Sequence, residues 1–235
     1  MSNRLQRALS SRLAWRLSGV TYPTAIVATR GQLVTVQEYL DTSREQMTQL
    51  EHLIPPQARV LEFGCGLGGN LISLSGAIRS GLGLDVNPGY LRLAKRFSSQ
   101  RGCTNLEFAL SSRPLATQAA FAPSFIFSVG VFERLPREVV REIIISLGEV
   151  LGAGGRMALY FLSPRAESSP FTSGLGDRAY VFWTNGQVRE MMSATGFEIQ
   201  ELFPWRGTSY RGVRDRAFYG DMYVVRRTRE PVVGG

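Results

Sequence analysis

Short apolar runs alternate with amphipathic stretches from residue 58 onward, and this alternation is the clearest pattern in the chain. The apolar runs have the length of buried strands, and the stretches between them carry apolar residues at helical spacing. The predicted strands are 59–63, 81–85, 105–110, 125–129 and 156–162, and the predicted helices are 69–78, 88–99 and 136–151. Repeated βα units of this kind predict a parallel sheet with helices on both faces.

The C-terminal part departs from this alternation. A helix predicted over 185–194 is followed by two strands, 197–203 and 218–226. The connection between these strands is rich in proline, glycine and charge, so no helix fits there. The last two strands are therefore expected to pair antiparallel at the sheet edge. The fold class predicted for the whole chain is α/β, doubly wound and mostly parallel.

The first 57 residues are interpreted as an N-terminal helical segment, a cap or lid, and residues 58–230 as the ligand-binding domain. Residues 3–17 place leucines on one helical face among arginines, and a second helix is predicted over 36–53. The basic helix can serve as a lid or pack on its own domain, or it can lie on an anionic membrane surface.

Composition excludes several classes of protein. No apolar run approaches the ~18 residues of a membrane span, and the start does not resemble a signal peptide, so a cytoplasmic protein without a transmembrane segment is expected. The two cysteines lack metal-ligand spacing, and His52 is the only histidine, so no metal site or histidine triad is expected. The net charge of +8 is concentrated toward the two ends, which indicates either an anionic partner or a solvated arginine-rich surface.

The glycine-rich stretch 62–70 is the predicted ligand site. Its glycines Gly64, Gly66 and Gly69 satisfy G-x-G-x-x-G between a predicted strand and a predicted helix. Such a loop turns sharply and leaves backbone N–H groups close to a ligand. Several nucleotide-binding folds share this pattern, so neighbouring residues must distinguish among them.

Two acidic residues narrow the choice of ligand. Glu62 stands two residues before the first glycine, where a carboxylate would repel a pyrophosphate and suits a ligand that carries positive charge. Asp85 ends the next predicted strand and can accept hydrogen bonds from both hydroxyls of a ribose; its alternative role is a turn or cap residue. Together they favour one ligand with a cationic end and a ribose.

With these residues identified, the chain resembles the class I S-adenosylmethionine (SAM)-dependent methyltransferases over about residues 36–226. The family's acid-x-Gly-x-Gly-x-Gly motif matches residues 62–68, and its ribose-binding acid matches Asp85. Weaker similarities follow in the family's order at 131–136, 151–156 and 183–186. The resemblance implies a seven-stranded Rossmann-like sheet that ends in an antiparallel hairpin, and SAM as the cofactor.

The resemblance also implies which residues bind the cofactor. These are Glu62, Gly64, Cys65, Gly66, Gly68, Asp85, Val86, Ser111, Ser112 and Val129. Val86 would lie beside the adenine, and the serines stand where the family often has an acid near the adenine amine. A hydroxyl can accept the same hydrogen bond without a charge.

The acceptor chemistry does not carry over, because many relatives have a histidine where this chain has Arg134. Glu133 and Arg134 follow the predicted strand 125–129 and are the candidate catalytic residues; the alternative is that they pair with each other or with solvent. A hydroxyl acceptor would need a base there, whereas an amine would need little help. Aromatic residues that can wall an acceptor pocket, or belong to the core, are Tyr160, Phe171, Tyr180, Phe182 and Trp183.

The predicted function is therefore methyl transfer from SAM to a small-molecule acceptor, such as a natural product, sugar or lipid intermediate. Nucleic acid is the less favoured partner: an RNA methyltransferase would use the basic termini, but no base-methylation motif of the Asn-Pro-Pro-Tyr type is present. A SAM-binding protein without catalysis remains possible on this sequence, and so does an NAD oxidoreductase, which Glu62 disfavours. The sequence does not indicate an oligomeric state.

Overall fold

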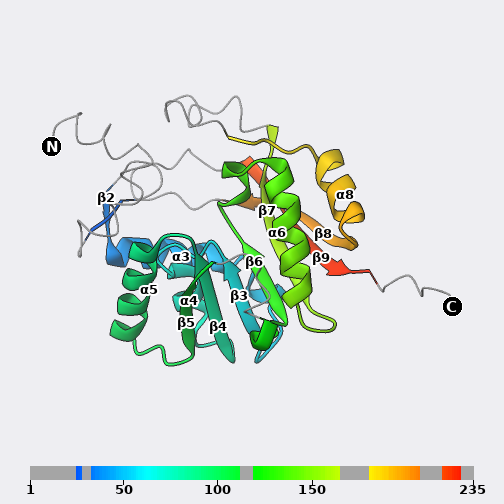
Figure 1. Cartoon of the computed structure of the whole chain (residues 1–235). Helices are drawn as coiled ribbons and strands as arrows, with labels where there is room; N and C mark the ends of the chain where they lie inside the picture. Colours follow the sequence, from blue (N-terminus) through cyan, green and yellow to red (C-terminus); the bar gives the residue numbers. More distant parts are fainter. Residues whose placement is uncertain (1–24, 28–32, 112–118, 165–179, 207–218, 229–235) are drawn as a thin grey trace.

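The computed structural model describes residues 25–27, 33–111, 119–164, 180–206 and 219–228 (Figure 1). They form a two-stranded sheet, β1-β2, and a seven-stranded sheet with the strand order β5-β4-β3-β6-β7-β9-β8. This is the predicted α/β class.

Five parallel strands make up most of the large sheet. They are β3 (Arg59–Phe63), β4 (Ser80–Asp85), β5 (Leu106–Leu110), β6 (Phe125–Ser128) and β7 (Arg156–Leu162). All five lie where the apolar runs predict them, and the neighbours among them pair parallel. Their carboxyl ends share one edge of the sheet, called the carboxyl edge below. The chain moves outward from β3 to β5 and returns beside β3 as β6, which creates a switch point between β3 and β6 where ligands bind in such sheets.

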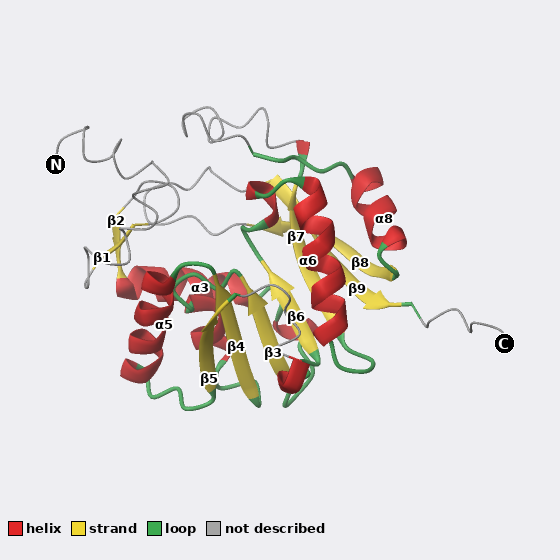
Figure 2. Ribbon diagram, viewed as in Figure 1, coloured by secondary structure: helices red, strands yellow, loops and turns green. Residues whose placement is uncertain are grey.

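Helices cover both faces of the sheet (Figure 2). Helices α3 (Val36–Met47), α4 (Gly69–Leu74) and α5 (Pro88–Gln100) pack on one face, and α6 (Arg137–Val150) and α8 (Asn185–Ala194) pack on the other. Side chains alternate along a strand, so Leu159 of β7 joins the core under α6 and α8, whereas Tyr160 joins the core under α3 and α4. These two sides are called the α6 face and the α4 face.

The last two strands form the predicted antiparallel pair. β8 (Phe197–Arg206) and β9 (Tyr219–Arg227) pair with each other, and β9 also pairs antiparallel with β7. β9 therefore lies between β7 and β8, and β8 forms the outer edge. The register of the pair shifts between Ile199 and Glu201, which marks a bulge in the edge strand.

The N-terminal part differs from its prediction. A short antiparallel pair, β1 (Ala25–Val27) and β2 (Leu33–Thr35), precedes α3 and was not predicted. Helix α3 begins at a capping box, in which the Thr35 and Glu38 side chains bond each other's backbone N–H. It ends at Met47 instead of continuing to residue 53, and residues Glu51–Leu53 form a separate 3-10 turn, η1.

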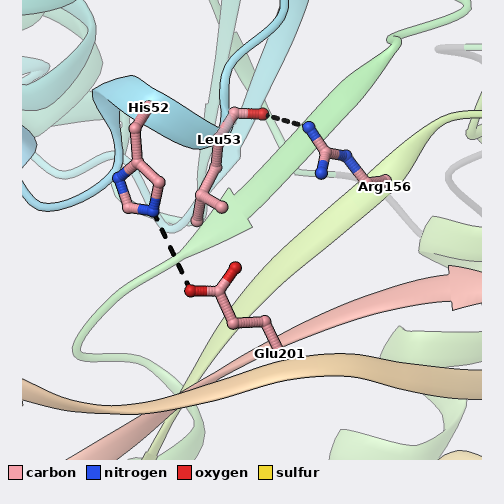
Figure 3. A network of polar contacts seen from close by, with 4 residues as sticks. All are labelled: His52, Leu53, Arg156 and Glu201. Atoms are coloured by element: carbon pink, nitrogen blue, oxygen red, sulfur yellow. Dashed lines mark hydrogen bonds and ion pairs between the residues drawn. The ribbon is translucent and has the colours of Figure 1, made fainter.

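The η1 turn connects the N-terminal part of the chain to strands β7 and β8 (Figure 3). The carbonyl oxygen of Leu53 accepts a 2.7 Å hydrogen bond from the Arg156 guanidinium at the start of β7. His52 Nε2 lies 3.9 Å from Glu201 Oε1 on β8, with both side chains well exposed. His52 is thus a surface residue in the turn that follows α3.

Some predictions fall outside the described residues. They concern the helix over 3–17, Ser112 and Phe171. Within the part of the chain that the structure describes, no helix is long and apolar enough to cross a membrane.

Candidate functional site

The glycine-rich loop between β3 and α4 lies at the switch point of the sheet. Its Gly64 and Cys65 N–H groups both donate to the Leu84 carbonyl, at 2.7 and 2.9 Å, and so fasten the loop to β4. Gly64, Gly66 and Gly68 have φ angles of 79°, 53° and 77°, which residues with side chains rarely adopt. A Cβ on Gly66 would meet no atom of the described residues within 4 Å. The backbone at Gly66 is therefore accessible to a ligand.

Glu62, the last but one residue of β3, is a buried carboxyl group with unused hydrogen-bonding capacity. It is 1% exposed, and its Oε1 accepts a 2.6 Å hydrogen bond from the Asn70 amide of α4. Its Oε2 is buried and has no hydrogen-bond partner among the described residues. Burial raises the pKa of Glu62 to about 8, and the charge of Asp85 adds to this rise, while hydrogen bonds from Asn70 and the Leu71 backbone oppose it. A cation placed beside Oε2 would reverse this shift.

Asp85 ends β4 and faces the same loop. Its Oδ2 accepts the Gly66 N–H at 2.8 Å, and its Oδ1 accepts the Asn87 N–H at 2.8 Å. Burial raises the pKa of Asp85, and the backbone hydrogen bonds oppose the rise. Asp85 therefore holds the loop and caps the turn into α5, which is the second role that the sequence allows. Each carboxylate oxygen keeps a second lone pair, so these bonds leave room for ribose hydroxyls.

Val86 follows Asp85 and is 76% exposed, an unusual state for a large apolar side chain at the end of a central strand. Leu110, at the end of the neighbouring strand β5, is 53% exposed. The two side chains provide apolar surface at the carboxyl edge beside the loop. A flat apolar group such as a purine can cover such a surface.

Tyr39 of α3 contacts the loop and was not predicted. Its hydroxyl oxygen accepts the Gly69 N–H at 3.3 Å, and its ring and the Ser43 hydroxyl occupy the space that a Cβ on Gly69 would need. Tyr39 and Ser43 stand four residues apart, on the same side of α3 as buried Leu40 and Met47. Tyr39 and Ser43, two residues with hydroxyl groups beside the apolar side of α3, were the sequence signal that this helix contacts a polar backbone segment as well as the core.

Glu133 and Arg134 lie in the 3-10 turn η3 (Phe132–Arg134), which follows β6. Glu133 is 1% exposed; its Oε1 lies 3.8 Å from Arg134 Nε, and its Oε2 has no hydrogen-bond partner among the described residues. Burial raises the pKa of Glu133, and the Arg134 charge opposes the rise. Arg134 also donates to the Gly130 carbonyl at 3.3 Å and lies over the Tyr180 ring. The two residues do pair, as one interpretation of the sequence expects, but one carboxylate oxygen is left unused.

Comparisons with solved structures give close likenesses in fold at low sequence identity. The magnesium protoporphyrin IX methyltransferase of Synechocystis PCC 6803, solved with S-adenosylhomocysteine (SAH), has a TM-score of 0.64 at 15% identity. The match covers 96% of this chain and 99% of the methyltransferase chain. A SAM-dependent methyltransferase of Methanosarcina mazei has a TM-score of 0.61 at 16% identity, covering 77% and 98%. A structure described for the conversion of a disulfide bond into a thioacetal group in echinomycin biosynthesis has a TM-score of 0.65 at 18% identity, covering 80% and 83%.

The chain has the class I methyltransferase fold. No protein-family model matches the sequence, and neither does any curated protein. The resemblance read from the motifs is thus confirmed at the level of the fold. The seven-stranded sheet with its antiparallel C-terminal pair is also confirmed.

The other residues predicted to bind the cofactor differ in which of their groups a ligand could reach. Cys65 contributes its backbone only, because its thiol is buried against Gly83 of β4, where a Cβ would lie 2.8 Å from the sulfur. The Ser111 N–H donates to the Asp85 carbonyl at 2.8 Å, which places Ser111 beside the end of β4. Val129 is partly buried against the core of the α4 face.

The acidic side chains of this methyltransferase fold are spread over several strand ends. No group of three or more histidine, cysteine, aspartate or glutamate side chains that could hold a metal ion occurs among the described residues. The cofactor candidates that the structure does bring together are the loop, Glu62 and Asp85, with Val86 at the rim.

Proposed function

We propose that this protein binds SAM and transfers its methyl group to a small-molecule acceptor. The observation that carries the proposal is the buried, unpartnered Oε2 of Glu62 next to a glycine-rich loop. An unpaired buried carboxylate is costly, so this group is stabilised when a cation binds beside it. SAM carries an ammonium group, and the fold is one in which SAM is bound by relatives.

The residues at the loop suit the parts of SAM. Glu62 would pair with the ammonium group, and the open backbone at Gly66 would lie along the methionine part. Asp85 would accept hydrogen bonds from the ribose hydroxyls. Val86 would cover the adenine, with Ser111 near its amine. An NAD pyrophosphate brings no cation to Glu62 and would favour its protonated form, which disfavours a dehydrogenase.

When bound, SAM supplies an electrophilic methyl group. The chain's own residues then need to align the acceptor, exclude water and, for a hydroxyl acceptor, take up its proton. We propose Glu133 for the last role, because its Oε2 is unpartnered and follows β6 at the carboxyl edge. Arg134 would hold Glu133 in place and lower its pKa.

A small-molecule acceptor is supported by the relatives in fold. One acts on magnesium protoporphyrin IX, and another is described for echinomycin biosynthesis. The fold alone does not define the acceptor, because one fold hosts many chemistries.

The cofactor is tested by thermal denaturation with ligands. We expect SAH to raise the melting temperature in proportion to its binding and NADH to leave it unchanged. The acceptor class is tested by incubating the protein with methyl-labelled SAM and a metabolite extract. Label in small molecules supports the proposal, and label found only in RNA contradicts it.

The role of Glu133 is tested by Glu133→Gln. For a hydroxyl acceptor, we expect kcat to fall about 100-fold or more, the usual effect of removing a general base, while SAH affinity stays unchanged. Glu149→Gln, an exposed carboxyl on α6, is the matched control and should leave kcat unchanged. Full activity of Glu133→Gln would show that this carboxyl group is not the base.

A further inference from the structure

Helix α4 begins without a side-chain cap. The residue before it, Gly68, has a φ of 77° and no side chain that could accept a hydrogen bond. The first N–H groups of a helix have no acceptor within the helix and need one from elsewhere. The Ile72 N–H makes the first bond of the helical pattern, to the Gly68 carbonyl at 2.9 Å. The N–H groups of residues 69–71 therefore depend on neighbouring parts of the chain.

Tyr39 of α3 supplies one of these acceptors. Its hydroxyl oxygen accepts the Gly69 N–H at 3.3 Å, and its ring would lie 2.6 Å from a Cβ on Gly69. Helix α3 packs beside α4 (Figure 1), and the half-buried Tyr39 joins a cluster of apolar side chains between α3, α4 and α5. At the start of α3, the Gln37 side-chain oxygen accepts a hydrogen bond from the Arg101 guanidinium just after α5. These contacts hold α3, and with it Tyr39, against the start of α4.

Glu62 of β3 contacts the next two residues of α4. Its Oε1 accepts a hydrogen bond from the Asn70 side-chain amide at 2.6 Å, and a hydrogen bond from the Leu71 backbone also reaches its carboxyl group. Its Oε2 is the atom left without a partner among the described residues. The first turn of α4 therefore determines the direction in which Oε2 points.

We propose that Tyr39 is a positioning residue for the cofactor: its hydroxyl fixes the first turn of α4, and this turn directs the Glu62 carboxyl group toward the ammonium group of SAM. This inference rests on the proposed function. Tyr39 acts through Gly69, Asn70 and Leu71 rather than by contact with the reacting atoms. A carboxyl group that is already held in one geometry binds a cation more tightly than one that must be ordered on binding.

Tyr39→Phe keeps the ring and removes the hydroxyl, so the Gly69 N–H loses its acceptor. We expect the Asn70 and Leu71 hydrogen bonds to Glu62 to weaken as the turn loosens. These bonds lower the pKa of Glu62, so their weakening raises that pKa further. SAH should then bind the variant about three- to tenfold more weakly at pH 7, the effect of one weakened hydrogen bond, as measured by isothermal titration calorimetry.

The pH dependence of binding separates this positioning role from a general loss of structure. At pH 9, about half or more of Glu62 is ionised in both proteins, so the loss of SAH affinity should shrink to about twofold or less. A loop that is merely distorted would bind SAH more weakly by the same factor at both pH values. Other titratable groups that face Glu62 are Asp85 of β4 and the Cys65 thiol. The variant retains both, and ionisation of SAH affects both proteins alike, so the ratio of the two affinities reports on Glu62.

Tyr223→Phe is the matched control. It removes a buried hydroxyl on the α6 face, which donates to the Asn185 side-chain oxygen at the start of α8. This change should lower the melting temperature and leave SAH affinity unchanged at both pH values. A double-mutant cycle with Asn70→Ala tests the path. Because Asn70 transmits part of the effect, Tyr39→Phe should weaken SAH binding less in the Asn70→Ala protein than in the wild type.

Three results would overturn the inference: unchanged SAH affinity in Tyr39→Phe, an equal loss of affinity at pH 7 and pH 9, or additive losses in the double-mutant cycle. Failure of the proposed function looks different, because the wild-type protein would then not bind SAH. In that case urea denaturation without ligand still tests the link between Tyr39 and Glu62. Stability is lost as pH rises through the raised pKa of Glu62, so the free energy of unfolding should fall more steeply between pH 8 and pH 9 in Tyr39→Phe than in the wild type. Equal slopes in the two proteins would refute the link.

Discussion

The pKa of Glu62 makes cofactor binding depend on pH in a calculable way. With a pKa of about 8 in the free protein, Glu62 carries a proton in about nine-tenths of molecules at pH 7. A ligand ammonium beside Oε2 favours the carboxylate, so binding must release that proton. We therefore expect SAH to bind with release of about 0.9 proton at pH 7.

The magnitude follows from the fraction of ionised Glu62. That fraction rises from about 1% at pH 6 to about 50% at pH 8, so SAH affinity should increase about fiftyfold over this range. Isothermal titration calorimetry at pH 6, 7 and 8 measures the affinity. Repeating the pH 7 titration in buffers of different ionisation enthalpy counts the released protons.

Glu62→Gln keeps the shape of the side chain and removes its titration. We expect weaker SAH binding, little change in affinity with pH and no proton release from this position. Glu107→Gln, an exposed carboxyl on β5, is the matched control and should retain the pH dependence. An affinity that is flat between pH 6 and 8 in the wild type, or an unchanged slope in Glu62→Gln, would refute the reasoning.

The same structure predicts three further outcomes. Without ligand, the raised pKa of Glu62 means that the free energy of unfolding falls as pH rises, by about 3–4 kcal/mol between pH 5 and pH 8 for a pKa moved from 4.5 to about 8. Glu62→Gln should remove this loss, which is measured by urea denaturation at the two pH values. Gly69→Ala should destabilise by about 1–3 kcal/mol, since its Cβ overlaps side chains of α3, whereas Gly76→Ala, whose Cβ meets no described atom within 4 Å, should melt like the wild type. Iodoacetamide should alkylate half-buried Cys103 in the native protein but Cys65 only after unfolding, because Cys65 is buried and burial raises the pKa of its thiol. If the folded protein is treated with iodoacetamide and then digested, finding Cys65 modified by mass spectrometry would contradict this.

Elements with local boundary signals were predictable from the sequence. β7 (Arg156–Leu162) and α8 (Asn185–Ala194) match their predicted ranges, because a glycine pair precedes the first and a Thr184 capping box begins the second. The positions of the glycine-rich loop after β3 and of Asp85 at the end of β4 were also predictable, since the glycines and the acid directly follow or end apolar runs. The roles of the loop, Glu62 and Asp85 toward a cofactor stay predictions. Apolar runs of this length leave few structures other than a buried parallel strand.

Features that depend on distant neighbours were not predictable. β8 was expected to stop at Phe203, because Pro204 lacks an N–H, yet it continues to Arg206. An edge strand tolerates proline where the missing N–H faces away from the sheet. This extension brings Trp205 into the sheet. The contact of Tyr39 with the loop was missed for the same reason, because helical periodicity does not show which loop a helix meets.

The place of β9 has a consequence for assembly of the sheet. β9 is the last strand in sequence, but it lies inside the sheet and connects β8 to β7. Until Tyr219–Arg227 is in place, β8 has no strand to pair with and β7 is left as an exposed edge. A chain that ends before Tyr219 therefore loses two strands, and with them the buried position of Trp205 against β9. The glycine-rich loop, built from β3, β4 and α4, is formed by earlier parts of the chain, so this half of the sheet can assemble before β8 and β9 join β7.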